Sequence, residues 1–108
     1  MIPQIHPSEL KRKLDAGEPV YLVDVRNPDE HAYCRLPESV LVPLPELAAR
    51  VAEVQPPEGA LVVVYCHHGV RSLRGAAVLL QAGIENAASL SGGIDAWSLT
   101  IDPTVPRY

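Results

Sequence analysis

The sequence contains no phenylalanine, one tryptophan and two cysteines among 108 residues. With so few aromatic side chains, a hydrophobic core has to be built from aliphatic residues, which agrees with an apolar fraction of 47%. An excess of basic residues is also lacking, because the net charge is −4 and the lysines and arginines form no stripe. Nucleic acid and anionic membrane are therefore poor partners for this chain.

Long apolar runs and an export signal are missing as well. The longest unbroken apolar run, from Ala60 to Cys66, is far shorter than the roughly 20 residues that a membrane span requires. The first residues show no apolar block followed by a small-residue cleavage site. We therefore expect a cytoplasmic protein with reduced thiols, and a chain of this length to form a single domain, residues 1–108.

Short apolar segments alternate with segments of helical periodicity. Apolar runs predict strands at 20–25, 39–44, 60–65 and 87–90. Apolar spacing and end signals predict helices at 7–17, 27–33, 45–54 and 73–83, and a short last helix after the glycines at 92–93. Because the strands are apolar throughout, the pattern predicts an α/β fold with a parallel sheet between two layers of helices. Ligands of such sheets bind beyond the carboxyl ends of the strands.

The segment YCHHGVRS places Cys66 at this edge, at the end of the most strand-like run. Backbone amides of the turn and of the next helix's first turn are expected to point into one concavity that binds anions. The same positive field favours a thiolate at Cys66 over a thiol. Gly69 allows a tight turn, Arg71 offers a planar fork to an oxyanion, and Ser72 can cap the helix.

A simpler interpretation makes Cys66 a small buried hydrophobe in an ordinary turn of solvated residues. The glycine, arginine and serine that follow at this spacing favour a reactive thiolate instead. We predict positioning and local positive charge, rather than acid–base catalysis, for the side chains of His67 and His68. Their backbone amides, together with that of Val70, are expected to line the anion cradle.

The loop resembles the active-site loop of rhodanese-like sulfurtransferases, which runs Cys, two residues, Gly, one residue, Arg, Ser. LVDVRNPDEH is similar to the family's first conserved stretch, with Asp24, Arg26 and Glu30 on its motif positions, and LSGGIDAW is similar to its Gly-Gly segment. The likeness extends in the right order from about Pro19 to Trp97. It implies a rhodanese-like domain whose five-stranded parallel sheet is flanked by helices on both faces, and it implies no metal or organic cofactor.

The resemblance also implies a chemistry. Cys66 would take a sulfane sulfur from a small-molecule donor, such as thiosulfate or a persulfide, and hand it to a nucleophile. The acceptor would be cyanide, a thiol or a sulfur-carrier protein. The substrate-binding residues of the loop would be His67, His68, Gly69, Val70 and Arg71.

Supporting roles are predicted for residues outside the loop. Asp24 and Arg26 flank the end of a strand, where Asp24 is expected to help orient the Cys66 loop, as is Ser72. For Arg26 we expect a structural ion pair with Glu30.

The chain departs from the family pattern at CRLPES, where Cys34, Arg35 and Glu38 stand in place of Gly, His and Gly. These changes are expected to reshape a loop and to affect any substrate contact made from it. Cys34 is predicted to be a small apolar filler rather than a resolving thiol for Cys66. A zinc site built from His31, Cys34 and the Cys66 loop is not expected, because consecutive residues rarely all reach one ion.

Two other functions compete with sulfur transfer. Phosphatases and arsenate reductases also hold an oxyanion around a Cys thiolate, but phosphatase loops place five residues between Cys and Arg. Only four residues separate Cys66 from Arg71, a spacing that favours a cradle for a single sulfur atom. A non-catalytic interaction module with the same fold would be expected to lose the nucleophile, which this chain keeps.

Overall fold

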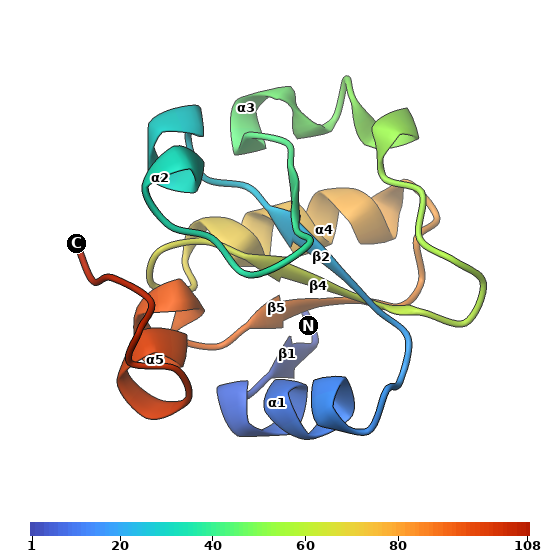
Figure 1. Cartoon of the computed structure of the whole chain (residues 1–108). Helices are drawn as coiled ribbons and strands as arrows, with labels where there is room; N and C mark the ends of the chain where they lie inside the picture. The colour runs from blue at the N-terminus through green and yellow to red at the C-terminus, as the bar shows by residue number, and fades with distance from the viewer.

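One parallel sheet of five strands organises the molecule, and the computed structural model describes all 108 residues (Figure 1). The strand order is β1-β5-β4-β2-β3, and every pairing is parallel. The strands are β1 (Gln4–Ile5), β2 (Val20–Asp24), β3 (Val40–Leu41), β4 (Leu61–Tyr65) and β5 (Ala87–Leu90). The predicted α/β fold with a five-stranded parallel sheet is confirmed.

Helices cover both faces of this sheet, as Figure 1 shows. They are α1 (Pro7–Asp15), α2 (Pro28–Tyr33), α3 (Leu44–Leu47), the 3₁₀ turn η1 (Val51–Glu53), α4 (Arg71–Gln81) and α5 (Gly93–Thr100). Leu10 of α1 and Trp97 of α5 pack on one face, whereas Leu47 of α3 and Leu79 of α4 pack on the other. None of these helices combines the length and the apolar character that a membrane crossing requires.

Cys66 directly follows the middle strand β4, at the carboxyl edge of the sheet. Its sequence LVVVY is buried from its second residue onward because neighbouring strands and both helical layers cover it. Asp24 of β2 is in register with Tyr65 of β4, so the two strands end at the same level. Val25 and Cys66, the next residue of each strand, therefore lie at the same level and in the same core, with Cys66 at the carboxyl edge of the sheet.

Strand β1 is an element that the sequence pattern did not predict by itself. It has only two residues and lies between Pro3 and Pro7, so it shows neither an apolar run nor an alternating pattern. Ile5 is buried and pairs with Leu90 at the edge of the sheet. Its strand conformation comes from this pairing and not from local propensity.

Two predicted elements are shorter than expected. The strand predicted at 39–44 is confined to Val40–Leu41, although the N–H groups of Val42 and Leu44 still donate to the carbonyls of Asp24 and Val25. The helix predicted at 45–54 is interrupted after Leu47. Bonds from the Glu53 N–H to the Arg50 carbonyl and from the Val54 N–H to the Val51 carbonyl tighten its second half into η1.

Candidate active site

The loop after β4 surrounds the sulfur of Cys66 with backbone donors. The Gly69 N–H donates to Sγ over 3.1 Å, and the Ser72 N–H, in the first turn of α4, donates over 3.3 Å. Cys66 is only 1% exposed. Two amides and the amino end of an eleven-residue helix thus direct partial positive charge at one buried sulfur.

Glycines let the loop lie directly on the amino end of α5. Gly69 has φ +96°, and a Cβ there would come within 3.0 Å of the Gly92 nitrogen. Beyond it, the N–H groups of Ile94 and Asp95 donate to the carbonyls of Cys66 and His67 over 2.9 and 3.0 Å. The loop is therefore held from both sides, by α4 and by α5.

Ser72 supports the sulfur in a way that differs from the prediction. Helix α4 begins at Arg71 and has no side-chain cap, so the expected capping role of Ser72 is wrong. Its hydroxyl oxygen lies 3.5 Å from the Cys66 Sγ and 2.7 Å from the Ser89 hydroxyl of β5, and both serines are fully buried. The sequence analysis missed Ser89, although a polar residue inside the buried strand AASL was a usable signal.

Arg71 lies beside the loop in a two-pronged ion pair with Glu30 of α2. Its Nη1 and Nη2 donate to the two carboxylate oxygens over 2.8 and 3.0 Å. These bonds are the main reason why the pKa of Glu30 falls from 4.5 to about 2, and the Asn27 N–H adds to the effect. These bonds hold the guanidinium of Arg71, the only one in the loop, in a fixed position. Val70, at the tip of the loop, is 71% exposed.

The expected pair between Arg26 and Glu30 is not formed. Arg26 instead donates twice to the Asp24 carboxylate, over 2.9 and 2.7 Å, and both residues are fully buried. The second Asp24 oxygen also lies 2.8 Å from the His31 Nδ1. Asp24 has no hydrogen bond to the Cys66 loop, so its side chain stabilises Arg26 below the site instead of orienting the loop.

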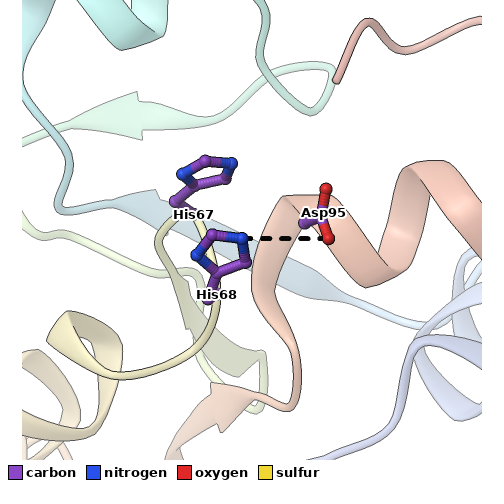
Figure 2. A group of neighbouring side chains, drawn as sticks. All are labelled: His67, His68 and Asp95. Atoms are coloured by element: carbon purple, nitrogen blue, oxygen red, sulfur yellow. Dashed lines mark ion pairs between the residues drawn. The ribbon is translucent and has the colours of Figure 1, made fainter. Parts of the chain in front are cut away.

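His67 and His68 of the loop form a cluster with Asp95 of α5 (Figure 2). The two rings stack at a centroid distance of 3.8 Å, and the His68 Nε2 lies 3.9 Å from an Asp95 oxygen. Arg107 holds the same carboxylate over 2.9 Å. An imidazole binds a metal in the plane of its ring, so two stacked rings do not point at one ion. This geometry favours two stacked rings beside a carboxylate over a metal site.

His67 is also the more buried of the two histidines. Its Nε2 is enclosed without a hydrogen-bond partner, and burial, together with the neighbouring His68, lowers the pKa of His67. The lowered pKa favours the neutral form of the ring, in contrast to the positive charge predicted for this side chain. On its other face it stacks on Tyr108 at 3.8 Å with an interplanar angle of 7°. The C-terminal segment gave no sequence signal for this contact.

The two cysteines lie in different cores. Cys34 packs with the residues under α1 and α5, whereas Cys66 packs with those under α3 and α4. The Cys34 Sγ is 3.5 Å from the Pro106 carbonyl, and Cys34 is 8% exposed. The sheet separates the two sulfurs, which favours the predicted filler role of Cys34 over a resolving role.

Comparison with known proteins places these features in context. The family model of the rhodanese-like domain matches residues 6–100. A sulfurtransferase of Allochromatium vinosum is 36% identical over 98 residues, which cover 91% of this chain and 90% of that protein. The probable adenylyltransferase/sulfurtransferase MoeZ of Mycobacterium tuberculosis is 34% identical over 96% of this chain, which spans only 26% of that protein. A thiosulfate sulfurtransferase structure from Pseudomonas aeruginosa gives a TM-score of 0.80 and 36% identity over 91% of this chain and 19% of that chain.

Proposed function

This chain belongs to the rhodanese-like family, and on that premise we propose that it is a sulfurtransferase which carries a sulfane sulfur as a persulfide on Cys66. The observation that carries the proposal is the pair of backbone amides, from Gly69 and Ser72, that donate to the Cys66 sulfur. Such donors stabilise negative charge on a sulfur without a metal. The arrangement supports a nucleophile that stays anionic before the transfer and a terminal sulfur that stays anionic after it.

Two displacements complete the proposed cycle. The Cys66 thiolate attacks the outer sulfur of thiosulfate, a new S–S bond forms, and the S–S bond of the donor breaks with its electron pair leaving on sulfite. A nucleophilic acceptor then attacks the terminal sulfur of the persulfide and releases the Cys66 thiolate. No proton has to be transferred in either step when the acceptor is an anion such as cyanide, so His67 needs no acid–base role.

Arg71 is the proposed receptor for an anionic donor. Its guanidinium is partly exposed, with 35% of the side chain accessible, and it is anchored by Glu30. Thiosulfate would share or displace this carboxylate, so we expect Arg71→Ala to weaken donor binding more than it slows the attack on the persulfide. His67, His68 and Val70 would contribute backbone amides to the same anion site.

A phosphatase is the weaker alternative. The amides of Gly69 and Ser72 converge on one sulfur atom, and only four residues separate Cys66 from Arg71, one fewer than in a phosphatase loop. We propose thiosulfate or a persulfide as donor, cyanide in an assay or a thiol or sulfur-carrier protein as acceptor, and the cytoplasm as the location.

Intact mass spectrometry tests the proposal directly. After incubation with thiosulfate and removal of the excess, the protein should gain the mass of one sulfur atom, and peptide mapping should place that atom on Cys66. Addition of cyanide should remove the added mass and produce thiocyanate. A protein that gains no sulfur from thiosulfate or from an organic persulfide is not a sulfurtransferase, and hydrolysis of a phosphate ester by it would favour the alternative.

Cys34→Ser should keep most of the sulfur-transfer activity. A one-cysteine cycle needs no resolving thiol, and Cys34 lies on the face of the sheet opposite Cys66. A serine hydroxyl can donate to the Pro106 carbonyl where the thiol now lies. Thiocyanate formation at saturating thiosulfate should therefore stay within about twofold of wild type. A loss as complete as that of a Cys66 variant would mean that a disulfide relay belongs to the mechanism.

A further inference from the structure

We propose that Tyr108 is a positioning residue for the Cys66 site, because its hydroxyl group holds Glu30 and thereby sets where the Arg71 guanidinium stands beside the loop. The proposal rests on the proposed function, in which Arg71 receives an anionic donor. Nothing in the sequence pattern or in the family likeness points to this residue. It lies beyond residue 100, where the match to the family model ends.

The phenol joins two ion pairs that otherwise do not touch. Its oxygen accepts a hydrogen bond from the Arg26 Nη1 over 2.8 Å and donates one to the Glu30 Oε2 over 2.7 Å. Arg26 is paired with Asp24 inside the protein, and Glu30 is paired with Arg71 at the loop. Tyr108 is the single side chain bonded to a member of each pair.

The direction of these two bonds is fixed by chemistry. A guanidinium has no lone pair to offer, so the hydroxyl has to accept from Arg26 and direct its only proton to Glu30. Burial is the largest factor that raises the pKa of Tyr108, to about 12, so the donor proton is present at any neutral or mildly alkaline pH. The hydrogen bond from this proton holds the Glu30 carboxylate in place and partly neutralises its charge. Glu30 then offsets less of the positive charge of Arg71, which attracts an incoming anion more strongly.

The ring of Tyr108 is held as firmly as its hydroxyl. It stacks on His67, the residue after the nucleophile, and meets the Tyr33 ring edge-on at 5.9 Å. The preceding residues are tied down as well, because Ser98 donates to the Val105 carbonyl and Arg107 donates to Asp95. Tyr108 is therefore a fixed part of the site's perimeter, although 43% of it is exposed.

Alkylation with two matched reagents separates a positioning role from a purely structural one. Iodoacetate and iodoacetamide share a leaving group and are similar in size, but only iodoacetate carries a negative charge. The ratio of their rates at Cys66 therefore reports the positive field that Arg71 supplies. We expect Tyr108→Phe to lower this ratio by about 3- to 10-fold, toward the value of Arg71→Ala, with little change in the iodoacetamide rate.

The control variant is Tyr33→Phe. It removes the same atom from a tyrosine whose ring touches Tyr108 but whose hydroxyl makes no hydrogen bond, so the ratio should not change. Tyr108→Ala, which also removes the stack on His67, should lower the ratio at least as much as Tyr108→Phe. In an Arg71→Ala background, Tyr108→Phe should have no further effect on the ratio, because the effect acts through Arg71.

Steady-state kinetics with thiosulfate provide the second measurement. Tyr108→Phe should raise KM severalfold and leave kcat nearly unchanged, the split expected for a weakened donor site. A lower melting temperature with an unchanged alkylation ratio, or an equal fall of both alkylation rates, would reduce Tyr108 to a structural role and overturn the proposal. Alkylation needs no sulfur transfer, so a protein that fails to form a persulfide but shows the expected ratios would refute the proposed function and not the role of Tyr108.

Discussion

Cys66→Ser is expected to abolish sulfur transfer while leaving the fold intact. The serine oxygen can accept the same N–H groups of Gly69 and Ser72 that now point at the sulfur, so no buried donor loses its partner. A hydroxyl at neutral pH is neither ionised nor able to carry a sulfane sulfur. Thiocyanate formation from thiosulfate and cyanide should fall to the uncatalysed rate, and the intact mass should stay constant in the presence of the donor.

Cys34→Ser is the matched control for this experiment, since it makes the same atomic change in the other core. A melting curve should show both variants folded, so that lost activity reports chemistry and not unfolding. If Cys66→Ser retains turnover, or if the wild-type sulfur atom is mapped to Cys34, Cys66 is not the sulfur carrier.

The part of the site that lies within one loop is visible in the sequence. Seven consecutive residues, Cys66 to Ser72, contain the nucleophile, the turn glycine, the arginine and the first turn of the next helix. A strand that ends before a helix has little freedom in where its amides point. Local chemistry alone therefore predicts an anion cradle, and the two amide bonds to the sulfur have this geometry.

The partners of that loop were much harder to predict. Glu30 meets Arg71 from 41 residues away, and the sequence analysis assigned it to Arg26 instead. Both arginines are close to it in space, so only the path of the backbone decides which one reaches it. Ser89 and Tyr108 come from a strand and from the end of the chain, where residue spacing carries no information about distance. Contacts of this kind depend on tertiary packing, which periodicity does not report.

The fold shows the same division between strong and weak local signals. The runs that became β2 and β4 are long, apolar and buried, and their predicted positions agree with the structure to within about one residue at each end. Strand β1 has two residues, and its conformation is imposed by β5. The break between α3 and η1 occurs within good helix-forming sequence, so local propensity alone does not predict it.

Gly93→Ala is expected to disrupt both stability and activity, because this glycine is where α5 touches the Cys66 loop. Its φ is +64°, and a Cβ there would lie 2.4 Å from the His67 carbonyl oxygen and 2.5 Å from that of Cys66. Both obstacles are backbone atoms, so no side chain can move aside. The same carbonyls accept the N–H groups of Ile94 and Asp95, and those bonds would have to lengthen.

We expect Gly93→Ala to lower the free energy of unfolding by roughly 3 kcal/mol or more, as measured by urea denaturation. Gly17→Ala separates the two causes, because Gly17 also has a positive φ, +71°, but nothing lies within 4 Å of its added Cβ. Gly17→Ala should lower the free energy of unfolding by only about 1–2 kcal/mol, because alanine is less stable than glycine in the left-handed conformation. It should keep full sulfur transfer. In Gly93→Ala, persulfide formation should fall even where the protein is still folded, because the carbonyl displacement tilts the amides away from the sulfur. Equal losses of stability in the two variants, with activity kept in both, would mean that the contact between α5 and the loop does not shape the cradle.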